Sequence, residues 1–137
     1  MPGIIDLKAE LTKLTMIDGR TPTTPEEERN KGVLRVAPYR DGAIFLARFS
    51  GKSAWERHPQ GDEIVQVVDG STILHVITDQ GRQSMTLTAG MMMVVPRNAW
   101  HQFDSADGVG VMTATPQPTE HIRLDVDDPR DAGRQGG

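Results

Sequence analysis

The stretch WERHPQGDEIVQVVDG, residues 55–70, places two glutamates, a histidine and an aspartate around a short turn and then continues as an apolar run rich in β-branched residues. Residues two apart on a strand share a face, so Glu56 and His58 project together. The turn HPQGD reverses the chain through its proline and glycine and returns Glu63 at the start of the next strand. The stretch therefore predicts three polar side chains at the edge of an apolar core.

Strand-like alternation begins at Val33, and Asp-Gly pairs separate several of the apolar runs. Because Asp-Gly suits the positive φ angles of tight hairpins, we expect turns at residues 41–42, 69–70 and 107–108, with further turns at 79–81 and 89–90. The predicted strands are VLRVAPY, AIFLARFS, SAWERH, EIVQVV, TILHVIT, QSMTLT, MMMVVP, WHQFDS and VGVMTAT. So many short strands with little helix between them indicate an all-β antiparallel sandwich or barrel.

A fourth polar side chain follows in VVPRNAWHQF, where His101 comes after a turn and Phe103 shares its face. Carboxylates in an apolar interior are costly and repel one another, so Glu56 and Glu63 need a proton or a cation beside them. Imidazole and carboxylate ligands suit Fe, Mn, Ni, Cu or Zn, and His58, His101 and Glu63 together match the two-histidine, one-carboxylate set of open-sided iron sites. The alternative to a metal site is a barrel in which the polar side chains at the mouth only form hydrogen bonds.

Two stretches, WERHPQGDEIVQVVDG and GMMMVVPRNAWHQFDS, resemble the two conserved motifs of the cupin superfamily. The first motif is written G-x5-H-x-H-x3,4-E-x6-G, and its second half is matched by His58, Glu63 and Gly70. The second is written G-x5-P-x-G-x2-H-x3-N and is matched by Gly90, Pro96 and His101. The resemblance covers residues 33–115 and implies a double-stranded β-helix, or jelly-roll barrel, of the kind that often holds a metal.

Three positions depart from these motifs. Glu56 stands in place of the first histidine, Asn98 in place of the later glycine and Ser105 in place of the terminal asparagine. Asparagine tolerates the left-handed conformation that such a turn requires. The metal ligands that the resemblance implies are Glu56, His58, Glu63 and His101. Glu56 is either a fourth ligand or a catalytic general base beside the metal. The expected cofactor is a divalent metal ion, with Fe, Mn, Zn and Ni not distinguished, although a second carboxylate favours a harder ion such as Mn or Fe.

Residues 1–32 are predicted to form an N-terminal arm outside the barrel of residues 33–116. One short helix is expected there, capped by Asp6, with an apolar face made by Ile4, Leu7, Leu11 and Leu14. The sequence TPEE predicts a second, brief helical turn with Thr24 as its cap and Pro25 in its first position. We expect the arm to pack against the domain or a partner rather than to take part in catalysis.

Residues 117–137 are predicted to form a C-terminal extension that becomes a mobile tail from Asp127 onward. Within it, His121 is expected to be a surface or packing residue. His75 is expected to be a neutral core histidine, with pocket lining as the alternative. Met91–Met93 are expected to fill the core, with a soft wall for an apolar ligand as the alternative. Other possible pocket groups, which their spacing does not decide, are Tyr39, Arg40 and Arg48.

The composition narrows the function classes. A formal net charge of -4 gives no attraction for a phosphate backbone, so no nucleic-acid partner is expected. No apolar run is long enough to cross a bilayer and no secretory signal is visible, which predicts a cytoplasmic protein without a membrane partner. The absence of cysteine leaves histidine, aspartate and glutamate to carry any chemistry.

Two functions are compatible with these residues. One is a metal-dependent enzyme of the oxygenase, isomerase, lyase or decarboxylase type, acting on a small organic molecule, as the resemblance permits. The other is a module that binds or senses a small ligand without turnover. A homodimer is expected in either case, since small barrels with an apolar arm and an exposed edge strand commonly pair.

Overall fold

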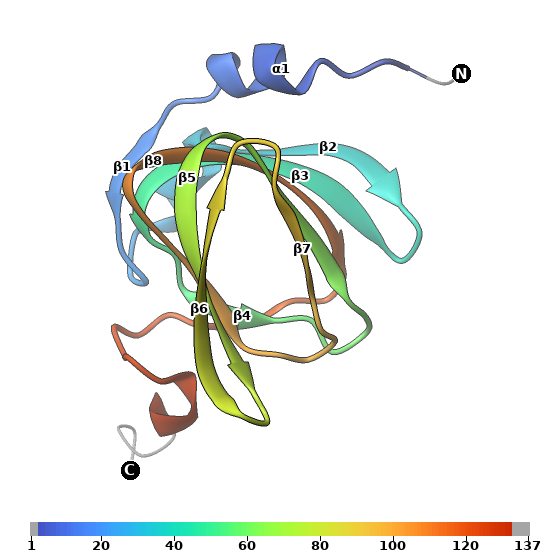
Figure 1. The fold of residues 1–137 in the computed structure, drawn as a ribbon. Coiled ribbons are helices and arrows are strands. Elements are labelled where there is room, and N and C mark those ends of the chain that lie inside the picture. The colour runs from blue at the N-terminus through green and yellow to red at the C-terminus, as the bar shows by residue number, and fades with distance from the viewer. Residues whose placement is uncertain (1–2, 133–137) are drawn as a thin grey trace.

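Two long strands organise the protein, β5 (Glu63–Thr78) and β8 (His101–Pro116), which pair with each other in antiparallel fashion. The structure is a computed structural model that describes residues 3–132 (Figure 1). The remaining strands are β1 (Ile17–Arg20), β2 (Val33–Tyr39), β3 (Gly42–Lys52), β4 (Trp55–Arg57), β6 (Gly81–Thr88), β7 (Met92–Val95) and β9 (Glu120–Ile122). The fold is all-β and curls into the expected jelly-roll barrel with a short helical N-terminal arm.

The pairing of the other strands closes the barrel around an apolar core. β8 pairs with β3 and, at its first residue, with β4, while β5 pairs with β7 through its first half and with β6 through its second half. Each long strand thereby bends through both walls of the barrel (Figure 1). The core side chains include Phe49, Val65, Val67, Leu74, Val76, Phe103, Val109 and Val111.

Only one of the three predicted Asp-Gly turns lies between two strands. The pair at 41–42 lies at the β2–β3 hairpin, where Tyr39 pairs with Gly42 across a two-residue loop. The prediction of hairpins at residues 69–70 and 107–108 is wrong, because the first pair lies inside β5 and the second lies inside β8. Gly70 has φ of 72°, and a Cβ there would lie 2.3 Å from the carbonyl oxygen of Gly108. These glycines permit the close approach and bend of two continuous strands instead of reversing the chain.

The N-terminal arm contains helix α1 (Leu7–Lys13), strand β1 and helix α2 (Glu26–Lys31). Asp6 caps α1 by accepting a hydrogen bond from the Ala9 backbone N–H, as predicted. The second helix is also present, but its predicted cap is wrong, because Pro25 occupies the N-cap position and the Thr24 hydroxyl accepts from the Thr21 N–H instead. β1 was not predicted, and it adds to the sheet parallel to β3.

The C-terminal extension packs against the barrel. β9 pairs with β4, and the carbonyl oxygen of Val126 accepts a hydrogen bond from the buried indole of Trp55. The 3-10 helix η1 (Pro129–Asp131) follows and buries Pro129. The mobile tail from Asp127 therefore stays a prediction, and residues 133–137 lie outside the described residues.

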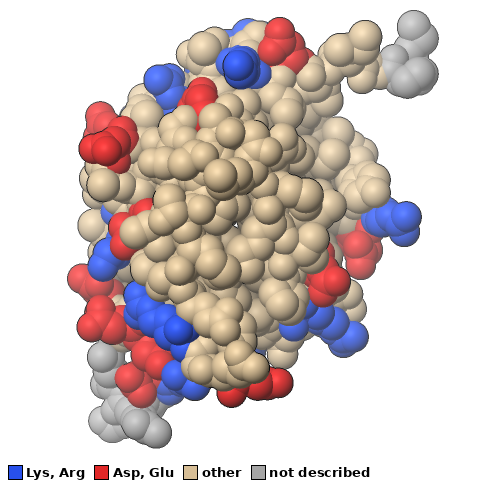
Figure 2. All heavy atoms as spheres, viewed as in Figure 1, with Lys and Arg blue, Asp and Glu red and all other residues tan. Residues whose placement is uncertain are grey.

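An apolar surface covers the outer side of β5 and β7. Met91 and Met92, which were predicted to fill the core, are about half exposed, as is Val94, and Ile64 and Ile73 are also exposed. Figure 2 shows few charged side chains over this face of the barrel. No helix among residues 3–132 is both long and apolar enough to span a membrane.

Candidate metal centre

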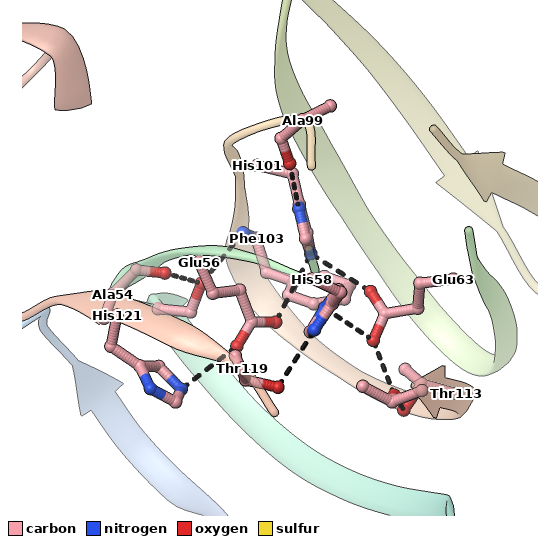
Figure 3. A network of polar contacts seen from close by, with 12 residues as sticks. Ala54, Glu56, His58, Glu63, Ala99, His101, Phe103, Thr113, Thr119 and His121 are labelled. Atoms are coloured by element: carbon pink, nitrogen blue, oxygen red, sulfur yellow. Dashed lines mark hydrogen bonds and ion pairs between the residues drawn. The ribbon is translucent and has the colours of Figure 1, made fainter. Parts of the chain in front are cut away.

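Four side chains from three regions of the chain meet inside the barrel (Figure 3). They are Glu56, His58, Glu63 and His101, and one ligand atom of each lies within 4.8 Å of those of the others. The pairing of β4 with β8 sets Glu56 opposite His101, which explains why residues distant in sequence share a site. His58, Glu63 and His101 are buried, whereas the Glu56 side chain is 22% exposed.

Hydrogen bonds outside the cluster hold each buried ligand in place. The Nδ1 of His101 donates to the carbonyl oxygen of Ala99 at 2.9 Å, which aims Nε2 at the cluster. The Nδ1 of His58 lies 2.9 Å from the Thr119 hydroxyl, with the same consequence for its Nε2. The Thr115 hydroxyl donates to Oε2 of Glu63 at 2.6 Å. These contacts orient the side chains as the outer partners of metal ligands do.

The inward atoms approach one another without forming aligned hydrogen bonds. His101 Nε2 lies 3.0 Å from Glu63 Oε1 and 3.4 Å from Glu56 Oε1, and His58 Nε2 lies 3.2 Å from Glu63 Oε2. These distances allow ion pairing, yet three of the buried atoms have no hydrogen-bond partner: His58 Nε2, Glu63 Oε1 and His101 Nε2. Buried polar atoms are almost always partnered, so the cluster fits a cation bound between imidazole and carboxylate groups.

The electrostatics of the cluster favour a cation. Burial alone would lower the pKa of His101, but its contacts with Glu56 and Glu63 outweigh burial and raise the pKa to about 10. Burial would raise the pKa of both carboxyls, but the neighbouring histidines lower both values, that of Glu56 well below its usual range. Two carboxylates thus stay ionised beside a protonated imidazole, and a divalent ion can replace that proton.

A cavity of about 370 Å³ opens onto the cluster. Glu56, His58, Glu63 and Phe103 line it. Other apolar walls come from Val33, Phe45, Ala47, Phe49 and Val111. The arm also lines this cavity, through Arg20, Arg29 and Asn30. The arm, which we expect to pack against the domain or a partner rather than to take part in catalysis, thus also forms part of the cavity wall.

His121 is a site residue that the sequence interpretation missed. Its Nε2 lies 3.3 Å from Glu56 Oε2, it lines the cavity, and β9 sets it opposite Glu56. Thr119 immediately precedes β9 and His121 lies within it, and both side chains contact the cluster. Their spacing was the available signal, because residues two apart on extended backbone share a face. The chain thereby places a histidine on each side of Glu56.

The other candidates lie elsewhere. His75 is buried and has polar partners on both ring nitrogens, with Nδ1 2.7 Å from the Ser84 hydroxyl and Nε2 3.2 Å from Asp104 Oδ2. This agrees with the core histidine that was predicted. Tyr39 and Arg40 line a second cavity, and Arg48 donates to the carbonyl oxygen of Leu14.

Comparison with known proteins agrees with the barrel. Residues 47–114 match the family model of the cupin domain. Protein NMB1881 from Neisseria meningitidis has a similar fold, with a TM-score of 0.56 and 22% identity over 88% of this chain and 100% of that one. A search of curated proteins finds no match to the sequence. The chain belongs to the cupin superfamily.

Two enzymes have a similar fold at lower identity. Hydroquinone 1,2-dioxygenase PnpCD, solved with Cd2+ and 4-hydroxybenzonitrile, matches with a TM-score of 0.53 and 16% identity over 61% of this chain and 63% of that one. Oxalate decarboxylase matches with a TM-score of 0.52 and 14% identity over 58% of this chain and 23% of that one. This chain thus spans less than two thirds of either enzyme chain, and at these identities the likeness concerns the fold.

Proposed function

We propose that this cupin is a metal-dependent enzyme acting on a small organic molecule bound in the barrel. The observation that carries the proposal is the convergence of four inward ligand atoms within 4.8 Å of one another, beside a cavity of about 370 Å³. Burying two carboxylates together is costly without a cation, so the cluster has no evident structural benefit in its own right.

His58, Glu63 and His101 would hold the ion, with Glu56 as a fourth ligand or as a base beside it. A divalent metal in this position supplies a Lewis acid that polarises a bound oxygen of the substrate. The apolar walls of the cavity exclude water from the substrate body, and hydrogen bonds with the Thr115 and Thr119 hydroxyls and the Ala99 carbonyl hold the ligand side chains in orientation.

Glu56 is the group suited to hold or move a proton. It is the least buried member of the cluster and lines the cavity, and its second carboxylate oxygen contacts His121. The His121 side chain is itself about one-third exposed, so a proton taken up by Oε1 or Oε2 of Glu56 has a neighbouring group that reaches solvent. This position supports a role for Glu56 in proton transfer.

The reaction belongs to the oxygenase, isomerase, lyase or decarboxylase types. The dioxygenase and the decarboxylase with similar folds support such chemistry in this barrel, although a shared fold does not choose among reactions. The alternative is a module that binds or senses a small ligand without turnover. The pairing of Glu56 with His121 favours the enzyme, because a binding module has no need of a proton path.

The test begins with elemental analysis of the purified protein, with Fe, Mn, Zn and Ni each supplied in turn. The proposal expects about one metal ion per chain in the wild type and its loss in Glu63→Ala and His101→Ala. Glu56→Gln then separates the roles of that residue. Retained metal with lost turnover identifies it as the base, whereas lost metal identifies it as a ligand. A wild-type protein that takes up none of the four ions contradicts the proposal.

We also propose that the chain forms a homodimer and works in the cytoplasm. The apolar surface over β5 and β7 supports pairing, since its exposed side chains would be covered by a second copy. Multi-angle light scattering should give twice the 15.0 kDa chain mass, and Val94→Asp should shift the protein toward the monomer. A wild-type mass of one chain contradicts this assignment.

A further inference from the structure

The N-terminal arm contributes an arginine to the wall of the metal-site cavity. Arg20 is the last residue of β1, and the parallel pairing of β1 with β3 sets it beside Gly51. Its guanidinium carbon lies 5.0 Å from the centre of the Phe49 ring, and both residues line the cavity that contains Glu56, His58 and Glu63. Arg20 lies in the N-terminal arm, outside residues 47–114, which match the cupin domain.

The guanidinium of Arg20 has no protein anion of its own. Its Nε is buried without a hydrogen-bond partner, and none of the ion pairs recorded for residues 3–132 includes it. Burial lowers its pKa to about 10, so the group remains charged at neutral pH. Arg20 is half-buried, and a charge that is partly removed from water without an anionic partner is costly, so the carboxylate of a ligand would stabilise it.

Neighbouring charges strengthen this preference for an anion. Arg29 lines the same cavity, and its Nε donates to the carbonyl oxygen of Thr24 at 3.1 Å. The charges of Arg29 and Arg123 both repel that of Arg20. Within residues 3–132, Glu56 is the opposite charge that acts on Arg20, and Glu56 already contacts His101 and His121. A planar guanidinium fork matches a carboxylate with two parallel hydrogen bonds, which an ammonium cannot do.

The apolar wall and the volume of the cavity determine which ligands fit beside Arg20. Its wall is largely apolar, through Val33, Phe45, Phe49, Phe103 and Val111. A volume of about 370 Å³ is near the lower end of small-molecule pockets and suits a molecule of about one ring with short substituents. We propose that the cavity takes a small organic carboxylate with an apolar body, whose carboxylate pairs with Arg20 while its body packs against the phenylalanines. This rests on the proposed function, because it names the ligand class of the same site.

The test is calorimetric binding of benzoate and hexanoate, with benzamide and hexanamide as neutral partners of the same shape. Wild type should bind the acids more tightly than the amides. Arg20→Gln should weaken binding of the acids about 10- to 100-fold, as loss of a charged hydrogen bond does, and leave the amides unchanged. The affinity of Arg20→Lys for the acids should fall between those of the wild type and Arg20→Gln, because lysine keeps the charge but cannot form the two parallel hydrogen bonds of a guanidinium. Arg35→Gln is the matched control, since Arg35 is exposed on β2 and the same charge is removed there.

The outcomes separate this inference from the metal proposal. Circular dichroism melts of each variant identify a folding defect, and if Arg20→Gln does not fold, Arg20→Lys carries the comparison. Acid binding that needs the metal but is unchanged in the Arg20 variants would place the carboxylate on the metal and overturn the role of Arg20, with the metal centre intact. Wild-type protein that binds neither acid, or binds acids and amides equally, also overturns it. Metal content, measured separately, tests the proposed function without reference to Arg20.

Discussion

Glu63→Gln separates metal binding from folding most cleanly. The substitution keeps the shape of the side chain and removes its charge. Glu63 is buried, its Oε2 accepts from the Thr115 hydroxyl, and its Oε1 lies 3.0 Å from His101 Nε2. The glutamine carbonyl can still accept from Thr115, and the amide can donate to a neutral His101, so the barrel should remain folded.

The size of the effect follows from these contacts. Unit charges 3.0 Å apart attract by about 5 kcal/mol at an effective dielectric constant of about 20. His101 avoids most of that loss by releasing its proton, which leaves a net cost to unfolding free energy of about 1–3 kcal/mol. The loss of a ligand charge for the metal cannot be compensated by the release of a proton in this way. Outer partners of metal ligands alone contribute about 10- to 100-fold, so loss of a ligand charge should weaken binding by more than about 100-fold.

Thermal unfolding with and without a chelator measures both quantities. Wild-type melting temperature should fall when the chelator removes the metal, whereas the variant should melt a few degrees lower and show no response to chelator. Glu120→Gln is the matched control, because Glu120 pairs with Arg57 at the surface and its loss should leave the chelator response unchanged. A Glu63→Gln protein that binds metal as tightly as the wild type would show that Glu63 is not a metal ligand.

Four further predictions follow from the same structure. Thr119→Val removes the partner of His58 Nδ1 and should weaken metal binding about 10- to 100-fold without unfolding the barrel; an unchanged affinity in a chelator competition would contradict it. Because the pKa of His101 is raised to about 10, metal binding at pH 8 should release about one proton, seen as calorimetric heats that depend on the buffer, and affinity should rise up to about pH 10. The same raised pKa stabilises the metal-free protein below about pH 6.5, and this stabilisation is lost as the pH rises toward 10; denaturant melts without an increase in stability on acidification from pH 9 to 6.5 would contradict it. Gly42→Ala places a Cβ 1.9 Å from a carbonyl oxygen of β8 and should lower the unfolding free energy by about 3 kcal/mol or more, whereas Gly61→Ala, with its nearest neighbour at 3.6 Å, should cost little; equal denaturation midpoints would contradict this.

The sequence predicts the site where short-range geometry determines it. Alternation along one strand places Glu56 with His58, and the turn after them brings Glu63 back to the same interior. Asn98 has φ of 63°, the left-handed conformation expected where the motif has glycine. The approach of His101 to these residues followed from the cupin resemblance, since spacing along the chain does not determine which strands pair.

The features that sequence reasoning missed depend on long-range pairing. Asp-Gly predicts a hairpin from local conformation, but at residues 69–70 and 107–108 the ladder between β5 and β8 keeps both strands continuous. β1 and β9 are four and three residues long, and their pairing with β3 and β4 brings Arg20 and His121 to the cavity. Segments this short and polar have no periodic pattern that distinguishes them from loops.

The most direct test of the metal centre is anomalous diffraction from crystals of the protein grown with the metal that it retains. We expect a single strong peak bounded by His58 Nε2, His101 Nε2 and a carboxylate oxygen of Glu63, at ligand distances near 2.0–2.2 Å. Peaks only at surface carboxylates or beside His75 and Asp104, with those three atoms still in contact with one another, would contradict it.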